Sequence, residues 1–157
     1  MRKLLLVAAV MLCASAAFAQ QGVKGVGVNL LYGTEIERVG VGAKFQYGIT
    51  DPIRAEASMN YFFENDDHYK AWEFNLNGHY LFDVMRDVKV YPLAGVVLAN
   101  WKQDVPGADA TTKLGINLGG GAELKVADSF SLNFECKYTL IDVNDQAVFL
   151  IGATYKF

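Results

Sequence analysis

The stretch FSLNFECKYTL, residues 130–140, alternates between apolar and polar side chains almost without interruption. Apolar residues take the even positions, and serine, asparagine, glutamate, lysine and threonine take the odd positions. Successive side chains of a β-strand point to opposite faces, so the pattern predicts a strand with one apolar and one polar face. In a soluble barrel the apolar face would form the core, whereas in a membrane barrel it would contact lipid.

The same alternation recurs along the chain and predicts seven further strands. They span residues 22–33, 38–48, 53–63, 71–82, 88–101, 113–125 and 147–157. Each strand is about long enough to cross a bilayer at a tilt, and the sequence shows no helical period of apolar residues. Short connections with Asp, Pro or Ser alternate with more acidic and mostly longer ones. The sequence therefore predicts an all-β, eight-stranded antiparallel up-and-down transmembrane barrel with short periplasmic turns and longer external loops.

The strand at 88–101 fits this pattern least well. Pro92 cannot donate a hydrogen bond to a neighbouring strand, and a closed barrel has no free edge at which a proline is tolerated. We therefore expect a bulge or a local irregularity near Pro92. The alternation in this strand also predicts that Leu93 and Val97 point inward.

The first residues have the features of a secretory signal peptide. A short basic start is followed by an apolar run and a small-residue site at positions 17–19. We predict export through the general secretion pathway with cleavage after Ala19, which leaves 20–157 as the barrel domain and 1–19 as the signal peptide. A retained anchor is disfavoured because the apolar run is short for a membrane span. The net charge of −3 and the lack of a basic patch argue against nucleic acid as a partner.

The two faces of the predicted strands differ in size as well as polarity. The apolar face carries most of the aromatic residues, and the other face carries glycine, asparagine, serine and some charged residues. The interior of an eight-stranded barrel is only wide enough for side chains to fill, so the large aromatics would not all fit inside. We therefore expect the apolar face to contact lipid and the polar face to pack inside. A soluble periplasmic lipocalin-like binder, with inverted faces, is an alternative.

Aromatic residues gather towards the two ends of the apolar face, which is typical of the two interfacial girdles of a transmembrane barrel. The predicted girdle residues are Tyr32, Tyr47, Tyr61, Phe63, Trp72, Tyr80, Phe82, Phe130, Tyr138 and Tyr155.

Charged residues on the polar face would be costly inside a packed barrel unless they are paired. We therefore predict an ion-pair and hydrogen-bond network in the lumen. Its members are Lys44, Arg54, Glu56, Glu73, Lys89, Glu123, Lys125, Glu135, Lys137 and Lys156. We expect this network to act as a structural plug, and a gated, narrow ion path is the alternative.

The acidic loops at 64–68 and 142–145 offer oxygens to a divalent cation, such as one that bridges lipopolysaccharide. Their spacing does not match a calcium-binding loop, so we expect a solvated acidic rim and no metal site. Catalysis needs a nucleophile and a base close together. His68 is in an external loop that lacks a serine, and His79 is expected inside the barrel, so the sequence predicts no catalytic site and no cofactor.

The chain ends on alternating apolar residues. The positions that carry this pattern are Phe149, Ile151, Tyr155 and Phe157, with Ala153 between them. Together with the strand pattern, they make the mature chain resemble small outer-membrane β-barrels of the OmpA/OmpX type, within the porin-like outer-membrane barrel families. This ending is similar to the signal by which the outer-membrane assembly machinery recognises such barrels.

The resemblance implies the outer membrane of a Gram-negative bacterium, passage with periplasmic chaperones, and contact with outer-membrane lipid and lipopolysaccharide. It does not imply a single role, because this fold hosts adhesion, structural, small-pore and enzymatic members. We expect a monomer without enzymatic activity. Its expected role is structural or surface-interactive: outer-membrane integrity, adhesion, or binding through the short acidic external loops. A small pore for ions or small solutes is the alternative.

Overall fold

The computed structural model describes residues 22–50, 52–63, 69–103, 111–142 and 145–157. The predicted signal peptide lies outside these residues. No helix among the described residues is long and apolar enough to cross a membrane. The described residues form nine strands: β1 (Lys24–Gly33), β2 (Arg38–Gly48), β3 (Ile53–Phe62), β4 (Tyr69–Tyr80), β5 (Phe82–Met85), β6 (Val88–Gln103), β7 (Thr111–Ala127), β8 (Phe130–Leu140) and β9 (Gln146–Lys156).

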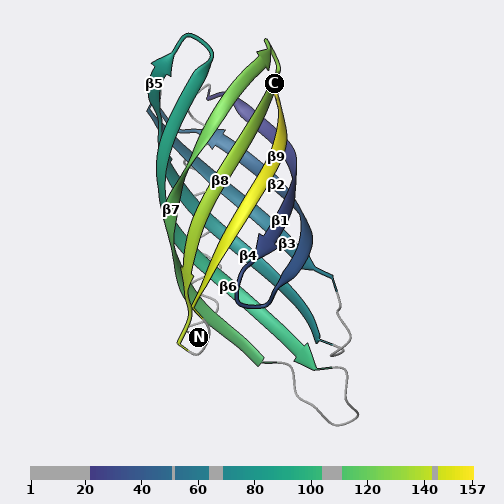
Figure 1. Cartoon of the computed structure of the whole chain (residues 1–157). Coiled ribbons are helices and arrows are strands. Elements are labelled where there is room, and N and C mark those ends of the chain that lie inside the picture. Colours follow the sequence, from purple (N-terminus) through teal and green to yellow (C-terminus); the bar gives the residue numbers. More distant parts are fainter. Residues whose placement is uncertain (1–21, 51, 64–68, 104–110, 143–144) are drawn as a thin grey trace.

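The strands close into an antiparallel barrel (Figure 1). Consecutive strands pair along the chain except β4 and β5, β1 pairs with β9, and β4 pairs with β6 to complete the ring. The short strand β5 continues β4, because His79 opposite Leu93 and Phe82 opposite Val90 keep one register against β6. The predicted eight-stranded barrel is therefore confirmed, with each strand close to its predicted bounds and only the strand at 71–82 divided in two.

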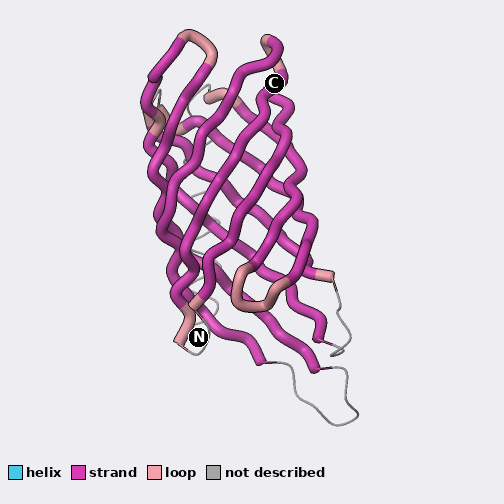
Figure 2. The backbone as a smooth tube through the Cα atoms, viewed as in Figure 1, coloured by secondary structure: helices cyan, strands magenta, loops and turns pink. Residues whose placement is uncertain are grey.

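The two ends of the barrel differ in their connections. One end, which we call the short-turn end, carries the connections between β2 and β3, β5 and β6, and β7 and β8. Lys24 and Phe157 also meet there, since the amide of Phe157 donates to the carbonyl of Lys24 over 2.8 Å. The connections between β1 and β2, β3 and β4, β6 and β7, and β8 and β9 lie at the opposite, long-loop end. The strands run steeply tilted between these two ends (Figure 2).

The predicted irregularity near Pro92 is present, but it lies in the neighbouring strand. On one side Pro92 stays in register opposite Gly120 of β7. On the other side the wall is interrupted at Leu81, between β4 and β5, and the Leu81 amide donates instead to the Pro52 carbonyl over 2.6 Å. Pro92 thus lies beside the interruption at Leu81. No strand partner is available there for a backbone N–H, so the missing N–H of the proline costs no hydrogen bond between strands.

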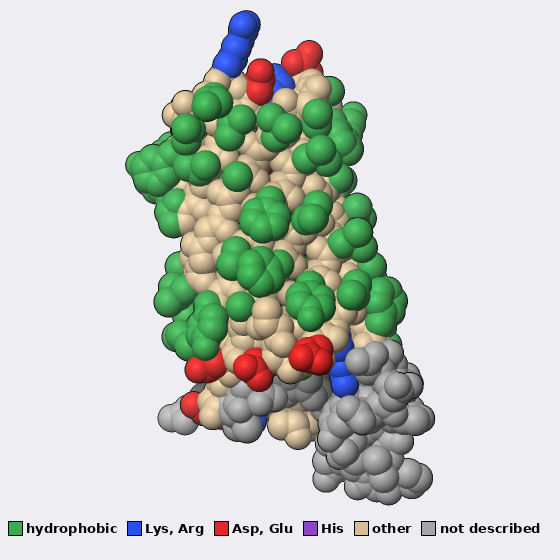
Figure 3. All heavy atoms as spheres, viewed as in Figure 1, with side chains coloured by type: hydrophobic (Ala, Val, Ile, Leu, Met, Phe, Trp, Pro, Cys, Tyr) green, Lys and Arg blue, Asp and Glu red, His purple; other side chains and the backbone are tan. Residues whose placement is uncertain are grey.

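Burial follows the alternation of the sequence. On β8, Leu132 and Phe134 are 43% and 50% exposed, whereas Asn133 and Glu135 are 4% and 1% exposed. Figure 3 shows hydrophobic side chains over the outer wall and charged ones at the two ends. The outer face of the barrel is therefore apolar and its inner face largely polar, as predicted. Cys136 also lies on the outer face.

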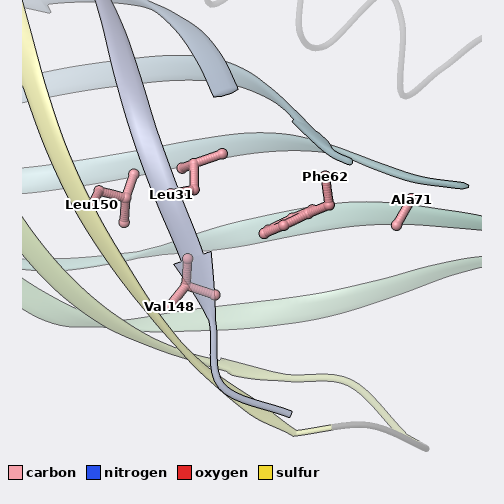
Figure 4. Close-up of a cluster of buried hydrophobic side chains, with 5 residues drawn as sticks. All are labelled: Leu31, Phe62, Ala71, Val148 and Leu150. Carbon is pink, nitrogen blue, oxygen red and sulfur yellow. The ribbon is translucent and has the colours of Figure 1, made fainter. Parts of the chain in front are cut away.

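The inner face is not polar along its whole length. Towards the long-loop end, five buried apolar side chains from β1, β3, β4 and β9 form one cluster (Figure 4): Leu31, Phe62, Ala71, Val148 and Leu150. Ile36 packs against this cluster, and Val97, Ala99 and Ile141 form a second one. We call these two clusters together the apolar plug. The alternation of the sequence does not predict this plug. As predicted, Leu93 and Val97 point inward.

Candidate functional site

The short-turn end of the interior is built around one shared carboxylate. Arg54 on β3 donates from Nη1 to Oε2 of Glu123 on β7 over 2.5 Å. Lys156 on β9 donates from Nζ to the other carboxylate oxygen, Oε1. Three strands that are far apart in the sequence are therefore joined through a single side chain. Because Arg54 and Glu123 are 5% and 2% exposed, this contact is screened little by water.

The next layer inward is centred on His79. Both Nε and Nη2 of Arg54 lie close to Nδ1 of His79, at 3.2 and 3.0 Å. The ring of Tyr91 stacks on the imidazole at 4.6 Å, and its hydroxyl donates to Glu135 over 2.9 Å. Arg54 also lies over the Tyr91 ring, with Cζ 5.0 Å from the centroid. The guanidinium, imidazole and phenol hold one another in a fixed arrangement.

Two further pairs extend the network around the wall. Gln46 on β2 donates to Oε2 of Glu56 over 2.7 Å, and Lys44 on the same strand donates to Asn133 over 2.7 Å. The ammonium of Lys44 also lies 4.0 Å from the Glu56 carboxylate. These contacts tie β2 to both β3 and β8.

The middle of the lumen is bridged by amides rather than by ion pairs. Asn117 on β7 donates to Asn75 and Asn77 on β4 over 2.7 and 3.1 Å. It also accepts from Thr139 over 2.8 Å, and Lys137 donates to Asn75 over 2.8 Å. Asn117 thus joins its own strand to the adjacent strand β8 and, across β6, to β4.

Seven of the predicted network residues are buried inside the barrel: Lys44, Arg54, Glu56, Glu73, Glu123, Glu135 and Lys137. The side chain of Lys156 is 24% exposed and still contacts Glu123. Glu73 accepts from Gln146 over 3.1 Å, nearer the long-loop end.

Lys89 and Lys125 differ from the prediction. Their side chains are 39% and 48% exposed and pair with Asp83 and Asp128, over 2.8 and 3.1 Å, at the rim of the short-turn end. The alternation predicted their direction from strand parity, but Lys89 lies directly after the turn that begins β6, and Lys125 lies close to the turn that follows β7. Water reaches them there because the barrel wall ends, so they are not part of the buried network.

The predicted girdle residues all lie on the outer face; Tyr47 and Trp72 are half-buried against their neighbours, and the others are exposed. Strand pairing sets Tyr61 opposite Trp72 towards the long-loop end, and Phe130 opposite Tyr155 towards the short-turn end. Phe134 pairs with Ile151 between the two groups, so the aromatics are sorted by height only in part. The residues of the predicted assembly signal also point outward: Phe149, Ile151, Tyr155 and Phe157.

Glu56, His79 and Glu135 place one potential ligand atom each within 4.8 Å of one another, so they are a possible metal site. The contacts of His79 do not fit this function. Nδ1 accepts from Arg54, so the neutral ring carries its hydrogen on Nε2, and neither nitrogen has a lone pair free for a metal. The ammonium of Lys44 near Glu56 would also repel a cation. The arrangement favours an ionic network.

Of the acidic loops, residues 64–68 and 143–144 lie outside the described residues. The carboxylate of Asp145 accepts from the amide of Ile141 over 3.1 Å, so it caps its own loop. His79, the histidine inside the barrel, contacts Arg54 and Tyr91 rather than a serine. These contacts do not form a nucleophile–base pair among the described residues.

The interior opens at the short-turn end into a cavity of about 490 Å³, which we call the vestibule. Its polar lining residues include Gln46, Arg54, Glu123, Lys125, Ser131 and Lys156. The vestibule therefore lies directly over the shared carboxylate, and the apolar plug lies at the other end of the same interior.

Comparison with known proteins agrees with this architecture. Residues 5–157 match the model of the outer membrane protein beta-barrel domain family. No curated protein is similar enough in sequence to count as a relative. Among solved structures, the N-terminal β-barrel domain of Pseudomonas aeruginosa OprF is 15% identical, with a TM-score of 0.70 over 87% of this chain and 100% of that one.

Two further structures share the fold. Neisserial surface protein A is 16% identical, with a TM-score of 0.71 over 88% of this chain and 98% of that one. Ail of Yersinia pestis, crystallised with the heparin analogue sucrose octasulfate, is 15% identical, with a TM-score of 0.66 over 88% of this chain and 100% of that one. The predicted resemblance is confirmed: the chain belongs to the outer membrane protein beta-barrel domain family.

Proposed function

We propose that this chain is a non-conducting outer-membrane barrel with a structural and surface-interactive role. The apolar plug is the observation that carries this proposal. Phe62 and Val148 are fully buried inside the barrel, and Leu31 and Leu150 are 2% exposed. A hydrophobic constriction opposes the passage of ions because they would have to shed their water there. This favours a closed barrel over the small pore that is the alternative.

We also propose how the barrel is oriented in the membrane and how the chain reaches it. The short-turn end faces the periplasm and the long-loop end faces outward, as in barrels with short periplasmic turns. The signal peptide is removed after Ala19 during general secretion, and periplasmic chaperones hold the chain before assembly. Phe149, Ile151, Tyr155 and Phe157 serve as the assembly signal, and the two groups of outer aromatics anchor the barrel at the interfaces.

The surface role rests on the charge of the long-loop end. Four described acidic residues there are exposed: Glu35, Glu37, Asp142 and Asp145. Red side chains at this end of Figure 3 form part of its rim. A carboxylate rim attracts cations, so it favours lipopolysaccharide bridged by divalent cations over direct contact with a polyanion.

Single-channel recording tests whether the barrel is closed. The mature chain is refolded and inserted into a planar lipid bilayer, and the current is followed under an applied voltage. We expect no discrete conducting steps from the native chain, and conducting steps from Phe62→Ala, which opens the plug. Phe63→Ala, which removes the outward-facing neighbour, is the matched control and is expected to stay closed. Steady steps from the native chain would overturn the proposal in favour of a pore.

Calcium-dependent binding to lipopolysaccharide-containing vesicles tests the surface role. The variant Glu35→Gln/Glu37→Gln/Asp142→Asn/Asp145→Asn removes the charge of the long-loop rim. It is expected to lose most of this binding. A matched variant, Asp83→Asn/Asp87→Asn/Asp128→Asn, neutralises acids at the short-turn end and is expected to bind normally. Equal loss in both variants would contradict a specific role of the long-loop rim.

A further inference from the structure

The vestibule carries more positive than negative side chains. Four cations line it, namely Arg54, Lys89, Lys125 and Lys156, against two carboxylates, Glu123 and Asp128. A third acid, Asp83, pairs with Lys89 from outside the lining. The described residues of this mouth therefore keep an excess of positive charge.

The excess is concentrated at the floor of the vestibule. Glu123 forms ion pairs with both Arg54 and Lys156, so one negative charge is shared by two positive ones. Arg54 is nearly fully buried, and Lys156 is 24% exposed towards the opening. Positive charge in a partly dehydrated cavity is stabilised by an anion far more than the same charge on an open surface.

A hydroxyl of the lining supports the same conclusion independently of charge. Ser131 lines the vestibule and is only 1% exposed, and its Oγ has no hydrogen-bond partner among the described residues. A buried hydroxyl without a partner is costly, and it is able to donate to an oxygen placed in the cavity. Ser131 is on β8, whose neighbours β7 and β9 supply Glu123 and Lys156.

We propose that the vestibule is a binding site for a small oxyanion, the phosphate or carboxylate group of a solute on the short-turn side. Lys156 and Arg54 supply positive charge at its floor, Lys125 supplies it at the rim, and the Ser131 hydroxyl donates a hydrogen bond. Guanidinium and ammonium groups are the usual partners of both oxyanions. The apolar plug limits access to this end, so the ligand enters and leaves through the same opening.

Titration of the refolded mature chain in lipid nanodiscs tests the site. Inorganic phosphate and acetate are added separately, and the backbone amide signals of Ser131, Lys125 and Val148 are followed by NMR. We expect saturable shifts at Ser131 and Lys125 and none at Val148. Saturation by phosphate alone assigns the phosphate class, and saturation by acetate alone assigns the carboxylate class. Raising the salt concentration is expected to weaken binding because it screens the cations.

Variants separate a built site from diffuse attraction. Ser131→Ala is expected to weaken binding about fivefold by removing one hydrogen bond. Lys125→Gln is expected to weaken it about threefold, as for a partly exposed charge. Lys113→Gln removes a lysine from the other end of β7 and is the matched control, with no expected change. Heat-dependent migration on SDS gels checks that each variant is folded.

Two results would overturn the proposal. One is the absence of saturable shifts with both phosphate and acetate. The other is equal weakening by Lys113→Gln and Lys125→Gln, which would mean general attraction to the whole protein. Both results leave the conductance and lipopolysaccharide experiments unaffected, so this site stands or falls separately from the proposed function.

Discussion

The two ends of the interior are built on the same strands but hold opposite chemistry. Arg54 and Phe62 are both inward-facing residues of β3, and Lys156 and Val148 are both inward-facing residues of β9. Towards the short turns these strands supply charges, and towards the long loops they supply apolar side chains. The strand period sets which side chains point inward, but the chemistry of the interior changes along each strand.

The difference separates two physical tasks. The ionic end, as we call the charged network around Arg54, Glu123 and Lys156 at the short-turn end, joins particular strands through particular atoms, because a buried carboxylate needs specific partners. The apolar plug excludes water without regard to direction, since the hydrophobic effect depends on area rather than on angle. A polar interior alone would hold the wall together and still admit water and ions. We infer that the plug closes the barrel and that the ionic end fixes its shape.

The largest loss of stability is expected when the central carboxylate of the ionic end is removed. Glu123→Gln leaves Arg54 and Lys156 without their shared negative charge inside the wall. Removing one partner of a buried ion pair is expected to lower the free energy of unfolding by about 4 kcal/mol. Urea unfolding in lipid vesicles measures it. Lys125→Gln, at the exposed rim pair, is the control and is expected to cost about 0.5 kcal/mol. Similar losses for both would mean that the buried carboxylate has no special role.

The second largest loss of stability is expected when the apolar plug is disrupted. Phe62→Ala removes a fully buried ring and leaves a cavity, so we expect a loss of about 3 kcal/mol in the free energy of unfolding. The same vesicle unfolding experiment measures it, with Phe63→Ala on the outer face as the control. Because lipid replaces part of the lost contact outside, Phe63→Ala is expected to be clearly milder. A larger loss of stability for Phe63→Ala than for Phe62→Ala would mean that the outer face, and not the plug, holds the tightly packed apolar side chains.

The third prediction concerns the amide bridge in the middle of the lumen, between the ionic end and the apolar plug. Asn117 bridges β4, β7 and β8 in the middle of the lumen, and Asn117→Ala removes the acceptor of Thr139 and the donor to Asn77. The expected loss is about 2 kcal/mol. Asn100, which bonds Thr112 at an exposed position over 2.6 Å, is the matched control. Asn100→Ala is expected to change the free energy of unfolding by less than about 0.5 kcal/mol. A neutral Asn117→Ala would mean that water already replaces the bridge.

The smallest effect tests how tightly the wall packs on the polar interior. A Cβ added at Gly152 would lie 2.8 Å from Oδ1 of Asn133 and would also collide with Oδ1 of Asn29. Gly152→Ala is therefore expected to cost about 1 kcal/mol by overpacking. At Gly78 the nearest atom to an added Cβ is the Ala94 carbonyl oxygen at 3.7 Å, an ordinary contact. Thermal unfolding should show Gly78→Ala close to native, and equal shifts would indicate a loosely packed interior.

Much of the fold could be predicted because the inward and outward sets alternate without exception in the middle of most strands. Asn133 and Glu135 were predicted to point inward, and they do. The prediction failed at strand ends, where parity does not fix the environment. Lys89 and Lys125 have the predicted parity but lie where the wall gives way to water.

The apolar plug and the ion-pair partners could not be predicted in the same way. The alternation that places Phe63 on the outer face places Phe62 inside, but it does not show that Phe62 packs against apolar side chains of β1 and β9. The choice of Glu123 as the common partner of Arg54 and Lys156 depends on strand stagger around the closed ring. The shift between neighbouring strands brings together residues that are far apart in the sequence. The sequence therefore predicted which residues belong to the network but not which of them contact one another.

Sided cysteine labelling tests most directly whether the interior is open at one end and closed at the other. In a Cys136→Ser background, Lys156→Cys places a thiol in the vestibule and Val148→Cys places one in the apolar plug. A small, membrane-impermeant cationic thiol reagent is added to the refolded barrel in vesicles. We expect Lys156→Cys to react from the short-turn side only, and Val148→Cys to react only after unfolding. Rapid labelling of Val148→Cys in the folded barrel would show a water-filled lumen and contradict the closed interior.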